Sequence, residues 1–143
     1  MMKVFLDTNI ILDVLDARRH SAQTSIRIME LARKGYLEAV VTTQSILDAY
    51  YIASRCGIKK SEVDSLTKWM MSTINVRVIN EPDIREALRK DNPDFEDNCQ
   101  LAHADFEGCD YFITNDKKVL KRTDFSPIKM ITPEKFVEKM RIS

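Results

Sequence analysis

Acidic side chains follow apolar segments of this 143-residue sequence at several places, and four aspartates are candidates for catalysis. These are Asp7, Asp48, Asp97 and Asp116. Asp7 comes directly after the apolar run VFL, and Asp116 ends the stretch FITND. Asp97 lies in NPDFEDN, three residues after Asp94, and Asp48 lies in SILDAYYIA. The chemistry of the site depends on whether folding brings these carboxylates together.

Four carboxylates gathered in one crevice repel one another and need a counter-charge to remain ionised. Oxygen ligands without histidine or cysteine suit hard cations, so we expect Mg²⁺ or Mn²⁺. Such ions lower the pKa of bound water and neutralise charge on a phosphodiester. The four aspartates therefore indicate phosphodiester hydrolysis.

Each carboxylate also has a purely structural interpretation. Asp7 suits the N-cap of a helix that follows it, and Asp116 suits a turn. Asp94 is a good N-cap for the helix that contains Asp97, which would then lie in the first turn. Asp48 is consistent with a surface position beside a helix contact. Spacing alone does not separate these interpretations from the catalytic one.

Helical and extended patterns alternate along the chain. We predict strands at Lys3–Leu6, Ala39–Thr42, Val76–Ile79, Tyr111–Thr114 and Ile128–Ile131. We predict helices at Ile10–Leu15, after Ser21, from Thr43 to Arg55, from Ser61, from Pro82 to Arg89, from Pro93 to Gly108 and from Glu134 to Met140.

Most of the predicted strands are apolar on both faces, which indicates a parallel sheet covered on each side. The expected fold is a three-layer α/β/α domain over residues 1–143, with a central, mostly parallel five-stranded sheet. Ligands of open α/β sheets lie at the carboxyl ends of the strands. If the first and fourth strands are neighbours, Asp7 and Asp116 face each other there.

Composition limits the classes of function. The 22 basic and 22 acidic residues balance, so bulk electrostatic attraction to nucleic acid is not indicated and any such contact must be local. Arg18-Arg19-His20 and Lys117-Lys118 are expected in solvated loops, with phosphate binding as the alternative. The sequence has no recognisable signal peptide and no apolar run of about 20 residues, so we expect a soluble cytoplasmic protein. Three cysteines without a CxxC pair indicate reduced thiols.

The segment FLDTNIILDVL resembles the opening motif of the PIN domain family, and FEDNCQLAHADFEGCDYFITND is similar to that family's C-terminal half. The middle segment VVTTQSILDAYYIA resembles the family's second acidic helix. The resemblance implies a compact α/β ribonuclease that depends on Mg²⁺ or Mn²⁺. Members of this length are often toxins of the VapC type, which pair with an antitoxin and form homodimers.

Carried over by motif, Asp7, Asp97 and Asp116 match the family's acidic residues. Asp94 is implied as an additional metal ligand. Asp48 stands where the family usually has glutamate, which is one methylene longer. The hydroxyl and amide groups of Thr8, Asn9 and Thr114 are expected to orient the carboxylates by hydrogen bonds.

Two other classes of function compete with a nuclease. The first is a non-catalytic PIN-like module that binds RNA or a protein partner, which the shorter Asp48 and the neutral charge favour. The second is a phosphotransfer domain, which fits less well. Receiver domains need a lysine after the last strand, and dehalogenase-type phosphatases need Asp-x-Asp where this chain has DTN.

Overall fold

The computed structural model describes residues 1–142, which fold around one five-stranded sheet. Its strands are β1 (Lys3–Leu6), β2 (Glu38–Thr42), β3 (Asn75–Arg77), β4 (Tyr111–Ile113) and β5 (Lys129–Ile131). The helices are α1 (Thr8–Leu15), α2 (Ala22–Arg33), α3 (Thr43–Arg55), α4 (Lys60–Thr73), α5 (Glu81–Leu88), α6 (Phe95–Phe106), α7 (Lys117–Leu120) and α8 (Pro133–Ile142). The strand order is β3-β2-β1-β4-β5, and every neighbouring pair is parallel.

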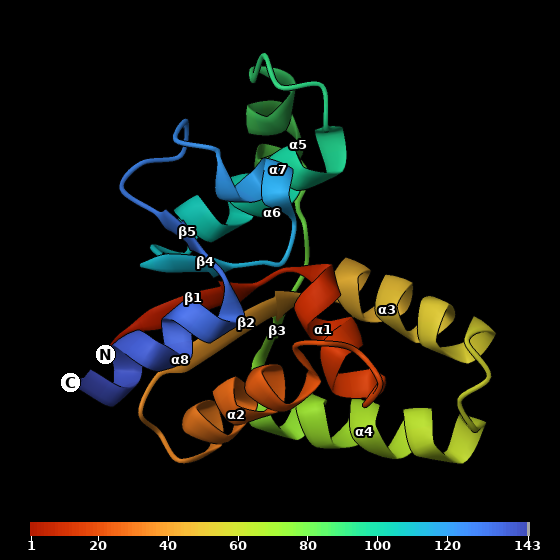
Figure 1. The fold of residues 1–143 in the computed structure, drawn as a ribbon. Coiled ribbons are helices and arrows are strands. Elements are labelled where there is room, and N and C mark those ends of the chain that lie inside the picture. The colour runs from red at the N-terminus through yellow and green to blue at the C-terminus, as the bar shows by residue number, and fades with distance from the viewer. Residues whose placement is uncertain (143) are drawn as a thin grey trace.

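Helices cover both faces of the sheet, as Figure 1 shows. The helices α1 to α4 and α8 lie on one face, and α5, α6 and α7 lie on the other. The alternation of side chains along β1 builds both cores. Val4 and Leu6 pack with α1, α2 and α3 residues, whereas Phe5 packs with Phe112 and with Leu101 of α6. The predicted three-layer α/β/α fold is confirmed, with a sheet that is parallel throughout.

The first strand is central, with β2 on one side and β4 on the other. Phe5 pairs with Val40 and with Phe112, and the backbone N–H of Asp7 donates to the carbonyl of Ile113 at 3.1 Å. The carboxyl ends of β1 and β4 therefore lie side by side, as the sequence required for Asp7 and Asp116 to meet.

Three local predictions were wrong. The third strand is Asn75–Arg77, because β2 ends at Thr42, which pairs with Arg77, and no neighbour remains beyond it. The fourth helix begins at Lys60, so Ser61 is not its N-cap. Lys117 and Lys118 lie in the short helix α7 and not in a loop.

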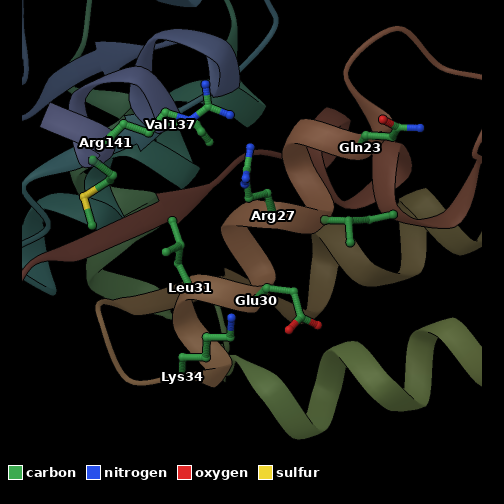
Figure 2. A pocket seen from close by; sticks show the side chains of 9 residues that line it. Gln23, Arg27, Glu30, Leu31, Lys34, Val137 and Arg141 are labelled. Atoms are coloured by element: carbon green, nitrogen blue, oxygen red, sulfur yellow. The ribbon is translucent and has the colours of Figure 1, made fainter.

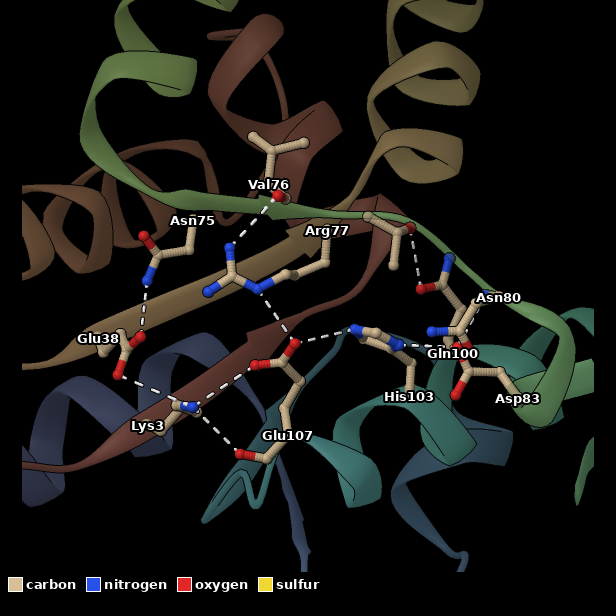
Figure 3. Close-up of polar contacts among 11 residues, drawn as sticks. Lys3, Glu38, Asn75, Val76, Arg77, Asn80, Asp83, Gln100, His103 and Glu107 are labelled. Atoms are coloured by element: carbon tan, nitrogen blue, oxygen red, sulfur yellow. Dashed lines mark hydrogen bonds and ion pairs between the residues drawn. The ribbon is translucent and has the colours of Figure 1, made fainter.

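A buried polar network joins α5, α6 and β3 across the second face, as Figure 3 shows. Nδ1 of His103 lies 2.8 Å from Oδ2 of Asp83, and Nε2 lies 3.1 Å from Oε2 of Glu107. Glu107 also accepts a 3.1 Å hydrogen bond from Nε of Arg77, and Nζ of Lys3 donates to its carbonyl at 3.1 Å. This network fixes α6, which carries Asp97 in its first turn.

No helix in residues 1–142 is both long enough and apolar enough to span a bilayer.

Candidate functional site

Asp7 is the most enclosed of the predicted site residues, with 6% of its surface exposed. Its Oδ1 accepts the backbone N–H of Thr8 at 2.8 Å, so Asp7 caps α1. Its Oδ2 accepts hydrogen bonds from Nδ2 of Asn9 at 3.2 Å and from Oγ1 of Thr114 at 2.7 Å. Burial raises the pKa of the Asp7 carboxyl above its usual value, against the opposing effect of these donors, and the charge of Asp116 adds to the rise. The N-cap interpretation of Asp7 is therefore confirmed, and it leaves the predicted site role of Asp7 open.

The hydroxyl of Thr114 is the junction between the two strand ends. It donates to Asp7 and accepts the backbone N–H of Asp116 at 3.0 Å and Nδ2 of Asn9 at 3.2 Å. Thr114 is fully buried, so this geometry is held by the surrounding packing. The expected orienting contacts of Asn9 and Thr114 to Asp7 are present.

Asp116 and Asp94 each cap a helix. Oδ1 of Asp116 accepts the backbone N–H of Lys118 at 2.8 Å, at the start of α7. Oδ1 of Asp94 accepts the backbone N–H of Asp97 at 3.1 Å, at the start of α6. Each cap uses one of the two carboxylate oxygens.

Burial and neighbouring carboxylates both perturb Asp97. Partial burial, a hydrogen-bonded contact with Asp94 and the charges of Asp7, Asp94 and Asp116 raise the pKa of Asp97 to about 8. The structure thus brings Asp7, Asp94, Asp97 and Asp116 into one electrostatic cluster, which we call the acidic centre. A carboxylate with so high a pKa indicates negative charge in excess of what the protein itself neutralises.

Asp48 meets a residue that sequence reasoning missed. Oδ1 of Asp48 accepts a 3.2 Å hydrogen bond from Nε2 of Gln44, one helical turn earlier. A second contact joins Asp48 to Glu96 of α6, and burial together with this contact raises the pKa of Glu96. The charges of Asp94 and Asp7 raise the pKa of Glu96 further. Asp48 therefore reaches the acidic centre beside Glu96, and the signal for Glu96 was its place between Asp94 and Asp97 in DFED.

A further buried carboxylate, Asp13, is linked to the acidic centre through Asn115 and Asn9. It is 1% exposed and accepts hydrogen bonds from Nε of Arg19 at 2.7 Å and from Oγ of Ser25 at 2.7 Å. It also accepts Nδ2 of Asn115 at 3.0 Å, and the backbone N–H of Asn115 donates to Oδ1 of Asn9 at 2.9 Å. With its charge paired to Arg19, Asp13 holds Asn115 and Asn9 in place.

The side-chain hydroxyl of Thr8 contacts Ser45 and not Asp7, the carboxylate that it was expected to orient. Its Oγ1 lies 2.8 Å from Oγ of Ser45 and so joins α1 to α3. Ser45 accepts Nε2 of Gln100 at 2.8 Å, and Thr42 donates to Oε1 of Gln100 at 3.1 Å. The side chain of Thr8 thus fixes the spacing of α1, α3 and α6, while its backbone N–H serves Asp7.

The donor chemistry of the acidic centre fits a divalent cation. It consists of carboxylates, and burial raises the pKa values of Asp7, Asp97 and Glu96, with the charges of neighbouring carboxylates adding to each rise. A cation bound there would favour their ionised forms. Within residues 1–142, no three Asp, Glu, His or Cys side chains converge closely enough to hold an ion as they are oriented. A cation would therefore be held only after side-chain rotation, by oxygens of Asp7, Asp97 and Asp116.

Two cavities differ in their relation to this centre. One, of about 620 Å³, lies between α2 and α8 and is lined by Arg27, Leu31 and Val137 among others, none of them a predicted site residue (Figure 2). The other, of about 520 Å³, is lined by Asp94 and Asp97 together with residues of α7 and the turn that follows it. The second cavity adjoins the acidic centre.

The chain is similar to known proteins in sequence and in fold. The chain is 27% identical over 143 residues to Ribonuclease VapC1 of Aquifex aeolicus, covering 96% of this chain and 94% of that protein. The solved structure of VapC20 from Mycobacterium tuberculosis, described as a Sarcin-Ricin loop cleaving toxin, is similar with a TM-score of 0.64 at 13% identity, over 85% of this chain and 97% of that one. VapBC2 of Rickettsia felis, solved bound to a promoter DNA fragment, gives a TM-score of 0.66 at 17% identity, over 90% and 98% of the two chains.

These structures share the fold at low identity. The family comparison is more specific, because the sequence model of the PIN domain matches residues 3–118, a span that contains every residue of the acidic centre. The chain belongs to the PIN domain family.

Proposed function

We propose that the protein is a divalent-metal-dependent endoribonuclease that acts as the toxin of a toxin–antitoxin pair. The observation that carries the proposal is that Asp97, in the first turn of α6, lies close enough to feel the charges of Asp7 and Asp116, which follow two adjacent strands. Its relative VapC1 of Aquifex aeolicus, named a ribonuclease, supports the choice of RNA as substrate.

In this proposal Asp7, Asp97 and Asp116 hold Mg²⁺ or Mn²⁺, with Asp94 as a further ligand. The bound ion supplies neutralisation of the phosphodiester charge and a lowered pKa for water. Asp48 and Glu96, which contact each other, position the attacking water as acceptors of its hydrogen bonds. Thr114 and Asn9 keep Asp7 fixed by donating to its Oδ2.

The partners we propose are an antitoxin protein and a second copy of this chain. Several similar structures are toxin–antitoxin complexes, including one from Klebsiella pneumoniae with a TM-score of 0.65 at 18% identity. The helix α3 exposes Leu47 and Tyr51, at 67% and 60%, on one face where a protein partner would bury them. Light scattering of the purified chain, with and without a co-expressed antitoxin, measures both associations.

The proposed reaction is tested by cleavage of a labelled RNA in Mn²⁺ by the wild type and by the Asp7→Asn and Asp116→Asn variants. We expect cleavage by the wild type, at least a hundredfold loss in each variant and none in EDTA. Equal cleavage by all three proteins would overturn the assignment.

A non-catalytic module that binds RNA or protein is the second candidate, and the shorter Asp48 favours it. Calorimetric titration with Mn²⁺ separates the two candidates. Binding that Asp7→Asn abolishes supports the nuclease, whereas an absence of Mn²⁺ binding in a well-folded wild type supports the module.

A further inference from the structure

The cavity of about 520 Å³ beside the acidic centre has two walls of opposite charge. Asp94 and Asp97 line one wall. The other wall consists of Lys118, Lys121 and Arg122, from α7 and the turn after it. A cation bound at the carboxylates would neutralise the first wall only. The positive charge of the second wall is suited to an anion.

The two lysines bring uncompensated charge to the cavity. Both are exposed, and neither side chain forms an ion pair with any residue in 1–142. Lysine is a flexible point charge that suits phosphate and does not require a planar partner.

Arg122 is built into the wall more rigidly. Its side chain is 6% exposed, and it donates to both carboxylate oxygens of Asp124, from Nε at 3.0 Å and from Nη2 at 2.7 Å. Its guanidinium also lies over the ring of Phe125, 5.3 Å from the centroid. The remaining nitrogen, Nη1, is buried and has no hydrogen-bond partner among the described residues. Buried N–H groups are normally paired, so Nη1 is a donor in need of an acceptor.

We propose that this cavity is a phosphate subsite, in which Lys118 and Lys121, backed by Arg122, hold an RNA phosphodiester next to the one placed at the acidic centre. The identity of the ligand as RNA rests on the proposed function. The subsite explains how a chain with no net charge holds a polyanion, because Lys118, Lys121 and Arg122 supply local positive charge beside the carboxylates.

The test compares two charge-matched double variants. Lys118→Ala/Lys121→Ala removes the subsite cations, and Lys34→Ala/Lys129→Ala removes two exposed lysines that precede β2 and begin β5, at the amino ends of the strands and away from the acidic centre. Binding of a fluorescein-labelled single-stranded RNA is followed by anisotropy in EDTA, over a series of salt concentrations.

We expect the subsite variant to bind about tenfold more weakly, with the slope of log K against log salt reduced by about 1.4, or about 0.7 for each lost phosphate contact. The control variant should bind as the wild type does. Equal weakening in both variants, or in neither, would overturn the subsite. Inorganic phosphate at millimolar concentration should displace RNA from the wild type more readily than from the subsite variant, because free phosphate competes for the same lysines. Equal displacement from both proteins would overturn the subsite.

Cleavage in Mn²⁺ is measured on the same proteins, so that the two proposals fail separately. We expect the subsite variant to show a raised KM with kcat preserved. A wild type that cleaves no RNA counts against the proposed function and leaves the binding result as the test of the subsite. A subsite variant that cleaves with unchanged KM counts against the subsite alone.

Discussion

The hydroxyl of Thr114, at the end of β4, donates a 2.7 Å hydrogen bond to Oδ2 of Asp7, at the end of β1. The two residues are far apart in the sequence, and the parallel pairing of Phe5 with Phe112 brings them together. This contact joins the fold to the acidic centre, because it fixes the orientation of the most buried carboxylate.

Thr114→Val removes the hydroxyl and keeps the shape of the side chain. We expect a 10- to 100-fold loss of Mn²⁺ affinity or cleavage rate, roughly the effect of removing an outer-shell hydrogen bond to a metal ligand. Thr114→Ser is the matched control and should retain most activity. Equal activity of the Val and Ser variants would show that the hydroxyl does not position Asp7.

Asp48 and Glu96 approach from different helices and are expected to act as one unit. Asp48→Asn and Glu96→Gln should each lower the cleavage rate about tenfold, and the double variant should lose less than the product, because coupled residues are non-additive. Asp105→Asn, an exposed position on the same helix, is the control. If the effects of the two substitutions on the cleavage rate multiply fully in the double variant, Asp48 and Glu96 act independently.

The raised pKa of Asp97, to about 8, makes metal-free stability depend on pH. The folded protein binds a proton that the unfolded chain releases above its value of 3.8, so this group costs stability progressively as pH rises from about 4 to about 8. With screening of a half-exposed group, Asp97→Asn should gain about 1 kcal/mol at pH 8 in EDTA, or roughly 3 to 5 °C in Tm. At pH 5 the two proteins should melt alike.

Thermal melts of wild type and Asp97→Asn at both pH values, with and without Mn²⁺, measure this effect. Mn²⁺ should raise the Tm of the wild type more than that of the variant, because only the wild type keeps the ligand. A variant that melts below the wild type at pH 8 in EDTA would contradict the crowding of the acidic centre.

His103 is 2% exposed, and each of its ring nitrogens faces a carboxylate, from Asp83 and from Glu107. Its removal leaves buried charge unpaired, so His103→Ala should lose about 3 kcal/mol of unfolding free energy, measured by urea denaturation. His20→Ala, at an exposed position, should change the free energy of unfolding little.

Arg77, His103 and Lys3 hold the pKa of Glu107 below its usual value despite burial, so the stability that this network contributes should fall as acid protonates Glu107. An unchanged free energy of unfolding in His103→Ala would show that this network does not stabilise the fold.

The sequence predicted much of the fold because its strands are apolar on both faces and its helices begin at recognisable caps. The caps at Asp7, Thr42 and Asp94 and the left-handed glycines Gly35 and Gly108 stand where these patterns placed the ends of elements. The end of β3 was not predictable, because it depends on where β2 stops. The five-stranded sheet was confirmed, and the structure adds the pairing of β1 with β4, which the sequence had left open as a condition for the site.

The parts of the site that the sequence did not predict depend on contacts between distant segments of the chain. Glu96 and Asp48 lie on helices separated by nearly fifty residues, and neither helix alone shows which of its acidic side chains meets the other. His103 has no ligand-like spacing, and only folding places Asp83 against it. The catalytic roles of Asp7, Asp48, Asp97 and Asp116 and the ligand role of Asp94 stay predictions.

The central claim is that Asp7, Asp97 and Asp116 form one cation site. Anomalous diffraction from crystals soaked in Mn²⁺ tests it most directly, with Asp7→Asn crystals as the control. The account predicts an anomalous peak within coordination distance of carboxylate oxygens from all three residues, and no such peak in the variant. A peak elsewhere, or none at millimolar Mn²⁺ in a crystal whose strand ends are open to solvent, would contradict it.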